Sequence, residues 1–365
     1  MESPDDVLVA GAGPVGLVLA MLLARRGHRV TVVEPRRAGE PPEVKCNHVA
    51  ARSMEVFRRL GVSATVRAAG LPDDYPHDIS YRTSTVGLEL TRIHIPGRRT
   101  RLTDKSGPDG GWPTVEPPHR INQLYLEPIL YAHAAAMPGI TFIHRARVEQ
   151  VRQDANGVTA RVVGVDDDAS RTLRARYLVG CDGGRSTVRK EIGARLHGDD
   201  VIQRVQSTYI RARGLIERMR TPPAWAMFTY SRVRSGNVYA IDGRETWLVH
   251  NYLRPDEPDF DSVDRAWAIR AILGVEADFP FEEISREDWY GRRLVADKFR
   301  DRRVFLCGDA CHLWVPYAGY GMNAGIADAE NLAFHLAAVL DGWGGEAALE
   351  AYVHERQPIT EQVSH

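Results

Sequence analysis

Three glycines and one acid near the N-terminus have the types and spacing of a nucleotide-binding turn. They are Gly11, Gly13 and Gly16, which follow the short apolar run Val7–Ala10, and Glu34, which follows a second apolar run. A glycine-rich turn lets a pyrophosphate approach the backbone, and an acid after the second strand can accept hydrogen bonds from ribose hydroxyls. An ordinary glycine turn in an α/β unit would explain the glycines but not the position of Glu34. The pattern therefore predicts a dinucleotide site.

Two further acids follow apolar runs later in the chain. Asp182 ends the run that begins at Tyr177, and Asp309 follows the run Val304–Gly308. Ligands of open α/β sheets bind outside the carboxyl ends of the strands, so both acids are candidates for the same site. Beyond Asp309 lie a glycine-rich loop and an expected helix over residues 324–340, whose start has no good capping side chain. Its first N–H groups can therefore bind an anion.

Cysteine, histidine and aspartate residues raise the question of a metal. Cys307, Cys311 and His312 could supply half of a site, but no second pair lies at ligand spacing and Cys307 falls in an apolar strand. The acidic run at 166–168 lies where a hairpin tip is expected, so solvated turn residues are the better interpretation. We therefore expect no metal.

Alternating periodicities predict the elements that position these residues. The first forty residues read as strand, glycine turn, helix and strand, which is the order of a parallel dinucleotide-binding unit. The other main predictions are helices over 52–60, 120–137 and 261–273, and a hairpin over 236–241 and 246–253 joined by Asp242-Gly243.

Length and composition limit the class of protein. The chain has 365 residues, 44% of them apolar and 26% charged, and a net charge of −1. This is typical of a soluble globular protein, long enough for two sizeable cores or one large discontinuous domain, and it gives no reason to expect nucleic acid or a membrane as partner. The acidic start has no secretory n-region, the longest apolar run is too short to span a bilayer, and four cysteines make no disulfide framework. We expect a cytoplasmic protein.

Together the three motifs resemble the group A flavoprotein aromatic hydroxylases, which share the para-hydroxybenzoate hydroxylase fold, and the phenol-type hydroxylases most. The glycine turn with Glu34 is similar to the family's site for the ADP part of FAD. Cys181-Asp182-Gly183 resembles its DG motif, and Gly308-Asp309 its GD motif. The resemblance implies an α/β (α+β) fold, in which a Rossmann-like FAD-binding domain of the glutathione-reductase type carries an inserted, mostly antiparallel β-sheet substrate domain.

The domain boundaries follow from the irregular, Gly- and Pro-rich segment after residue 75 and from the alternating strands of the middle of the chain. We expect a discontinuous FAD-binding domain over 1–75, 115–188 and 296–365, and a substrate-binding domain over 76–114 and 189–295.

The resemblance also assigns roles to single residues. Arg52 and Gln123 match positions that contact FAD, and Pro316 lies in what resembles the loop beneath the flavin ring, where Ala318 replaces a common glycine. His48 is the candidate base for a phenol, although it lies one position away from the base of some phenol hydroxylases; a structural hydrogen bond is the alternative. The cofactor-binding residues predicted in this way are Gly11, Gly13, Gly16, Glu34, Arg52, Gln123, Asp182, Asp309, Gly321, Met322 and Asn323.

The implied activity is that of an FAD-dependent, NAD(P)H-driven monooxygenase that hydroxylates a phenolic or other electron-rich aromatic substrate. O2 is the co-substrate, the oxygen donor is a C4a-hydroperoxyflavin, and NAD(P)H docks transiently because the chain has one dinucleotide fingerprint. A homodimer is compatible with this expectation. Alternatives are a flavoprotein of the same fold performing epoxidation, Baeyer–Villiger oxidation or reduction, and a non-catalytic flavin-binding accessory protein. The halogenase-type Trp-x-Trp-x-Ile-Pro motif does not occur in the sequence.

Overall fold

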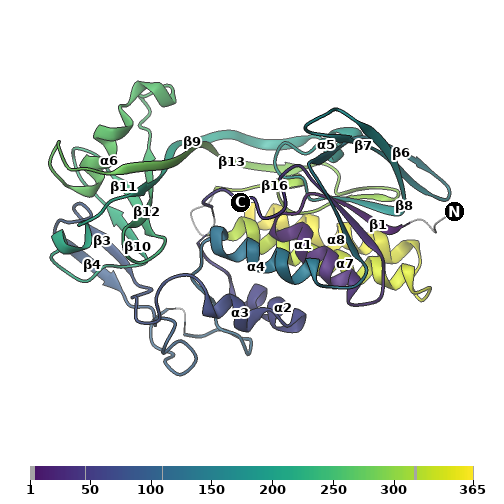
Figure 1. The fold of residues 1–365 in the computed structure, drawn as a ribbon, viewed down its shortest axis with the longest axis horizontal. Coiled ribbons are helices and arrows are strands. Elements are labelled where there is room, and N and C mark those ends of the chain that lie inside the picture. Colours follow the sequence, from purple (N-terminus) through teal and green to yellow (C-terminus); the bar gives the residue numbers. More distant parts are fainter. Residues whose placement is uncertain (1–4, 46, 109, 316–318, 365) are drawn as a thin grey trace. The chain divides into compact units, whose positions relative to one another are not determined.

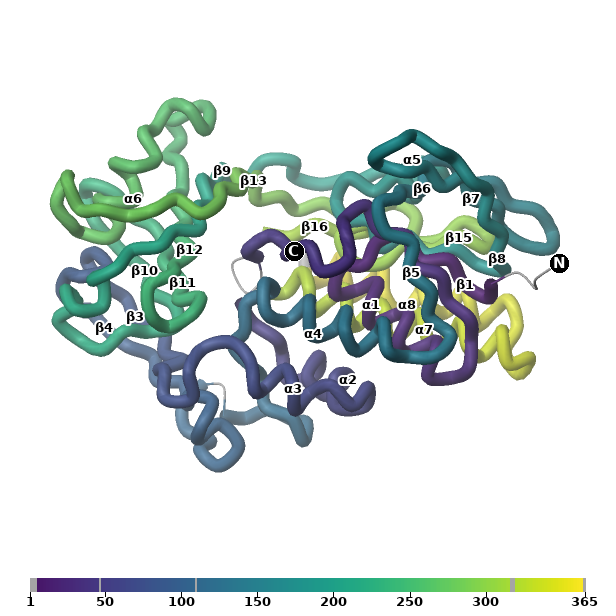
Figure 2. Tube along the Cα trace, viewed as in Figure 1, coloured from purple at the N-terminus to yellow at the C-terminus, as the bar shows by residue number. Residues whose placement is uncertain are grey.

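A computed structural model describes residues 5–45, 47–108, 110–315 and 319–364, drawn as a ribbon in Figure 1 and as a trace in Figure 2. The chain forms two compact units. The first unit comprises Met1–Pro41, Glu127–Asp200 and Arg292–His365, and the second comprises Pro42–Leu126 and Val201–Gly291. These units are defined by contacts within the chain rather than by ligands, so the predicted division into an FAD-binding and a substrate-binding domain stays a prediction.

The first unit is built on a sheet with the strand order β14-β15-β8-β1-β2-β5. From β15 to β5 neighbouring strands are parallel, so their carboxyl ends lie at one edge of the sheet. The antiparallel strands β6 and β7 extend from β8. The strands of this sheet are β1 (Asp5–Ala10), β2 (Val30–Glu34), β5 (Ile140–His144), β6 (Ala146–Asp154), β7 (Gly157–Gly164), β8 (Ser170–Gly180), β14 (Arg300–Asp301) and β15 (Val304–Leu306). The short strand β16 (His312–Leu313) also belongs to this unit but pairs with β13 (Glu282–Ala296) of the other sheet.

Helices pack against this sheet, and α1 and α7 bury most of their apolar residues. In Figure 1, α1 lies beside α7 and α8 next to the sheet, and the packing of α1 on α7 and of α7 on α8 is extensive. The helices are α1 (Pro14–Ala24), α4 (Gln123–Ala135, which begins in the second unit), α5 (Thr187–Glu191), α7 (Tyr320–Leu340), α8 (Glu346–Ser364) and the 3₁₀ turn η3 (Gly308–Ala310). The order strand, glycine turn, helix, strand is confirmed at the start of the chain.

The second unit contains the mostly antiparallel order β9-β12-β11-β10-β3-β4, in which only β10 and β3 are parallel among the described strands. One face of this sheet packs a core that includes Met227, Val238 and Trp247, all with no exposed surface. The strands are β3 (Ile79–Arg82), β4 (Glu89–Ile93), β9 (Leu196–Arg211), β10 (Ala226–Thr229), β11 (Gly236–Ala240), β12 (Thr246–Tyr252) and β13 (Glu282–Ala296). β9 and β13 continue into the first unit, and the predicted hairpin is confirmed as β11–β12.

The remaining helices of the second unit are short. They are α2 (Ala51–Leu60), α3 (Ser63–Ala68), η1 (Ile216–Arg218), η2 (Phe260–Ser262) and α6 (Arg265–Leu273). The expected helix over 261–273 begins later because the Asp264 side chain accepts the N–H of Trp267 and caps α6. No helix of the described residues is long and apolar enough to cross a membrane.

Candidate functional site

The glycine turn between β1 and α1 is tight at two positions and open at the third. Gly11 has a φ of +102°, and a Cβ placed there would lie 2.4 Å from the carbonyl oxygen of Cys181. A Cβ at Gly16 would lie 2.1 Å from the Gly11 carbonyl oxygen, whereas nothing lies within 4 Å of one at Gly13. The outer glycines are therefore required by the fold, and Gly13 faces space through which a ligand can approach the backbone.

Glu34, at the end of β2, points into this turn. One carboxylate oxygen accepts the N–H of Ala12 at 2.7 Å, and the other accepts the backbone N–H and Nε of Arg36 at 3.0 and 2.8 Å. Burial raises the pKa of Glu34, but the bonds and charge of Arg36 outweigh burial, and the net pKa is lowered. The ionised carboxylate keeps lone pairs that can accept ribose hydroxyls. Glu34 was predictable from the sequence, whereas the contact of Arg36 with Glu34 depends on the fold.

The second and third motifs lie against the first within the same unit. Gly11 packs on the backbone of Cys181 and Asp182, and a Cβ at Gly308 would lie 3.2 Å from a methyl group of Val15 and 3.5 Å from the Cα of Gly325. A single dinucleotide site requires the loops of all three motifs to meet at one edge of the sheet. They do so because β1, β8 and β15 are neighbouring parallel strands.

The two motif acids differ in what they contact. Asp182 accepts the hydroxyl of Ser186 and the N–H groups of Thr187 and Val188, at 2.7 and 3.1 Å, and thereby caps α5. Asp309 is exposed, although its neighbours on both sides are buried. Asp182 thus orders its loop, whereas Asp309 is exposed to solvent at the third motif.

Beneath the third motif lies a buried carboxylate that belongs to none of the three sequence motifs. Asp328, in α7, has no exposed surface. Its carboxylate accepts the N–H of Gly308 at 3.1 Å, Nε2–H of His312 at 2.7 Å and Nε–H of Arg356 at 2.7 Å. Burial raises the pKa of Asp328, but His312 and Arg356 outweigh burial and lower it, so the group is ionised. The sequence signal that could have indicated this residue is an acid within the otherwise apolar run of the helix.

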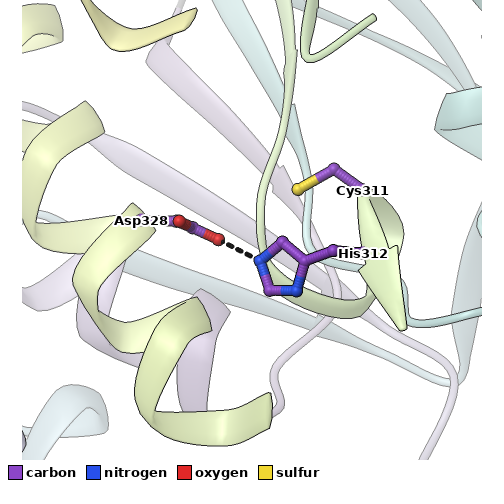
Figure 3. A group of neighbouring side chains, drawn as sticks. All are labelled: Cys311, His312 and Asp328. Atoms are coloured by element: carbon purple, nitrogen blue, oxygen red, sulfur yellow. Dashed lines mark hydrogen bonds and ion pairs between the residues drawn. The ribbon is translucent and has the colours of Figure 1, made fainter. Parts of the chain in front are cut away.

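Cys311, His312 and Asp328 form a group that could be mistaken for a metal site (Figure 3). Their potential ligand atoms lie within 4.8 Å of one another, and all three residues are buried. However, Arg356 already places a cation on the same carboxylate, and burial raises the pKa of the Cys311 thiol well above its usual value. A protonated thiol and a neighbouring guanidinium suit an internal hydrogen-bond network better than a divalent ion.

The loop predicted to lie beneath the flavin begins outside the described residues and ends inside a helix. Pro316 and Ala318 are not among the described residues. Gly321, Met322 and Asn323 belong to the first turn of α7, which begins at Tyr320 rather than at residue 324. The helix starts early because Gly319 takes a left-handed φ of +68° and its carbonyl accepts Nδ2–H of Asn323 at 2.7 Å. No described side chain caps this helix, as expected.

The other predicted site residues lie in the second unit. Arg52 is exposed in the first turn of α2. Gln123 is the first residue of α4, and its N–H donates to the carbonyl of Lys45 at 3.1 Å. His48 lies in the segment that leads to α2. Their roles toward a cofactor stay predictions.

His48 belongs to a cluster of basic side chains that we call the cationic cluster: His48, His77, Arg101, His119 and Arg120. Arg101 is 3% and Arg120 6% exposed, and His77 and His119 are also buried. Burial and the arginines lower the pKa of His48 well below its usual value, and burial and the neighbouring basic groups lower the pKa of His77 and of His119 to about 3. At neutral pH the imidazoles are neutral and the arginines carry the charge. His48 is then a weak base, so a hydrogen bond from its ring suits it better than full proton transfer.

This cluster predicts a loss of stability in acid. A histidine whose folded pKa is lowered takes up its proton in the unfolded chain first, so the unfolding free energy falls as pH drops below about 6.5. For His77, which faces Arg98, Arg101, His119 and Arg120, the loss continues toward pH 3 at up to about 1.4 kcal/mol per pH unit. Urea unfolding of wild type and His77→Gln between pH 6 and 4 should show a shallower pH slope in the variant. Equal slopes would contradict the assignment of a neutral, buried His77.

Three comparisons with known proteins bear on the site. A sequence model described as "FAD binding domain" matches residues 5–365. The chain is 31% identical to the FAD-dependent monooxygenase apdD of Emericella nidulans, over 98% of this chain and 59% of that protein. It is also 31% identical to the 4-methyl-5-nitrocatechol 5-monooxygenase of a Burkholderia species, over 98% of this chain and 66% of the relative. The chain therefore spans less than two thirds of either relative.

A solved structure extends the likeness to the fold. Aklavinone-11 hydroxylase, solved as a ternary complex with FAD and aklavinone, superimposes with a TM-score of 0.86 and 30% identity, covering 100% of this chain and 68% of that one.

Proposed function

The chain belongs to the FAD-binding domain family along its whole described length, and from this premise we propose that it is an FAD-dependent monooxygenase that hydroxylates phenolic or other electron-rich aromatic compounds. One observation carries the proposal: the glycine turn, the Asp182 loop and the Gly308-Asp309 loop meet at one edge of the parallel sheet. Relatives named for aromatic substrates, such as the nitrocatechol monooxygenase, support the substrate class.

The residues at this edge fit FAD. The space at Gly13 admits a pyrophosphate, ionised Glu34 can accept ribose hydroxyls, exposed Asp309 can bind the ribityl chain or ribose, and the uncapped start of α7 favours negative charge on the reduced ring. Bound FAD would supply the redox chemistry, with NAD(P)H as electron donor and a C4a-hydroperoxyflavin as the implied oxygen donor. The protein's part is to hold the cofactor, orient the substrate and exclude water.

Oxygen consumption tests the proposal directly. The FAD-loaded protein is mixed with NADH or NADPH and a panel of phenols and polyketide-like aromatics, and O2 uptake and product masses are recorded. We expect substrate-stimulated uptake and a product one oxygen atom heavier than the substrate. Stimulated uptake without oxygen incorporation would indicate other flavin chemistry, and no stimulation by any aromatic would indicate an accessory protein.

Asp309→Ala is expected to purify with little or no flavin. Its carboxylate is exposed at the carboxyl edge of the sheet, where it can accept hydrogen bonds from cofactor hydroxyls, and the loss of a charged hydrogen bond costs about 1.5–3 kcal/mol, or roughly 10- to 100-fold in affinity. Flavin absorbance per protein measures the effect, with the exposed Asp256→Ala as control. A fully yellow Asp309→Ala protein would show that the third motif does not bind FAD.

A further inference from the structure

Arg36 lies just beyond β2, beside Glu34, the carboxylate that can accept ribose hydroxyls. The backbone N–H and Nε–H of Arg36 donate to one oxygen of Glu34, at 3.0 and 2.8 Å, and the other oxygen accepts the N–H of Ala12 at 2.7 Å. Protein donors therefore hold both oxygens of this buried carboxylate. A carboxylate fixed in this way has little freedom to rotate, so its remaining lone pairs keep one direction.

A second carboxylate contacts the far end of the same guanidinium. Nη1 of Arg36 lies 2.5 Å from Oε1 of Glu127 in α4, and Glu127 is only 5% exposed. Burial lowers the pKa of Arg36, but Glu34 and Glu127 outweigh burial and raise it. Leaving a buried carboxylate without its cation is costly, so the planar guanidinium is confined to the position from which it reaches both acids.

The backbone of Arg36 is held as well as its side chain. Its carbonyl oxygen lies 3.2 Å from Nδ1 of His144, at the end of β5, and Nε2 of the same ring lies 2.8 Å from the hydroxyl of Tyr131. Tyr131 is one turn beyond Glu127 on the same face of α4. Helix α4 therefore contacts the guanidinium of Arg36 directly and also contacts the ring that binds its carbonyl.

These contacts have two interpretations. The first is structural: the bridge through Arg36 joins α4 to the end of β2 and has no effect on a ligand. The second is functional, because Arg36 makes the only side-chain hydrogen bond to Glu34 among the described residues. The other donor to Glu34 is the backbone of Ala12, which belongs to the glycine turn itself. The direction of the Glu34 carboxylate therefore depends on Arg36.

We propose that Arg36 is a positioning residue for recognition of the cofactor's adenosine ribose. Together with Glu127 it orients the Glu34 carboxylate so that the ribose hydroxyls donate to that carboxylate. The inference rests on the proposed function, because FAD is the ligand that brings this ribose. Arg36 acts through Glu34 and need not contact the cofactor. The preference of the site for a dinucleotide with ribose hydroxyls then depends on a residue of the following loop and on one residue of α4.

A cofactor analogue separates positioning from a purely structural role. The FAD-free protein is titrated calorimetrically with FAD and with the FAD analogue built on 2′,3′-dideoxyadenosine, whose adenosine ribose has no hydroxyl to donate. We expect the wild-type protein to bind FAD about 10- to 100-fold more tightly than the analogue, the range of a charged hydrogen bond. Arg36→Gln should bind FAD about 10-fold more weakly than wild type, with nearly unchanged affinity for the analogue, because only the orientation of the acceptor is lost.

Two further variants complete the comparison. Arg37→Gln removes the same charge from the next residue, which is exposed, and should keep the wild-type preference for FAD. Glu127→Gln keeps Arg36 and the shape of the acid but weakens the bridge, so it should reduce the preference in part, and it tests the inference if Arg36→Gln does not fold. Equal weakening of FAD and analogue in these two bridge variants, or a wild-type preference in both, would overturn the inference.

The titrations distinguish this inference from the proposed function. A protein that prefers FAD to the analogue through Arg36, but never consumes oxygen with an aromatic compound, would refute the monooxygenase and keep the role of Arg36. A protein that hydroxylates an aromatic compound, but binds FAD and the analogue equally well, would keep the enzyme and refute the role of Arg36. Binding of neither dinucleotide would overturn both.

Discussion

Gly16→Ala should destroy the cofactor turn, whereas Gly13→Ala should leave the fold intact and remove only the cofactor. A Cβ at position 16 would lie 2.1 Å from the Gly11 carbonyl oxygen, so the helix and the turn would have to separate. We expect a loss of about 4 kcal/mol or more in unfolding free energy, typical of severe overpacking and strain. At position 13 nothing lies within 4 Å of the added methyl group, and stability should change by about 1 kcal/mol or less.

Urea unfolding and flavin absorbance separate the two variants. Gly13→Ala should unfold at nearly the wild-type urea concentration but bind FAD at least about 100-fold more weakly, because its methyl group occupies the approach of the pyrophosphate. Gly16→Ala should lose both properties. If Gly13→Ala retained full flavin, the space at that glycine would not be the phosphate site. A wild-type unfolding midpoint for Gly16→Ala would show that the turn is not as tight as described.

Asp328→Ala is expected to cause the second large loss. The substitution removes the shared acceptor of Gly308, His312 and Arg356 and leaves a partly buried guanidinium without its carboxylate. Breaking a buried pair by removing one partner costs about 3–5 kcal/mol. The Gly308 amide also loses its acceptor, so the third motif should loosen and FAD should bind more weakly even where the protein is folded.

Two further variants show whether the loss of stability in Asp328→Ala comes from its contacts with His312 and Arg356. Asp341→Ala breaks a more exposed pair, with Arg26 at 3.9 Å and His28 at 3.2 Å, and should cost about 1 kcal/mol or less. Combining Asp328→Ala with Arg356→Met removes the orphaned charge, so the double variant should be more stable than the sum of the single changes predicts. Strict additivity in urea unfolding would mean that the two side chains do not act together.

The parts of the site that could be predicted are formed by residues that lie close together in the sequence. The turn from Gly11 to Gly16 has a fixed spacing because one strand, one turn and one helix must follow one another directly. Glu34 follows from the length of that helix and the next strand. The start of α7 was placed wrongly because Gly321 reads as a loop residue, whereas the left-handed residue that begins the helix is Gly319.

The interactions that could not be predicted join residues far apart in the chain. Asp328 reaches Gly308 across 20 residues and Arg356 across 28, and no local pattern relates them. His48 looked like a base on the strength of its residue type. Its pKa is lowered by burial and by Arg120 and Arg101, which lie more than fifty residues further along, so only the fold reveals that its imidazole is neutral and weakly basic.

Arg356 belongs to α8, the last described helix, yet it holds the carboxylate that fixes the loop of the third motif. Attachment of α8 and closure of that loop are therefore coupled equilibria. A ligand that binds this loop and holds it closed must therefore also stabilise the attached state of α8, because the coupling between the two equilibria is reciprocal. Limited proteolysis in the connection 341–345 should then be slower in the FAD-loaded protein than in the FAD-free protein. The cleavage rate would report the fraction of protein that has FAD bound.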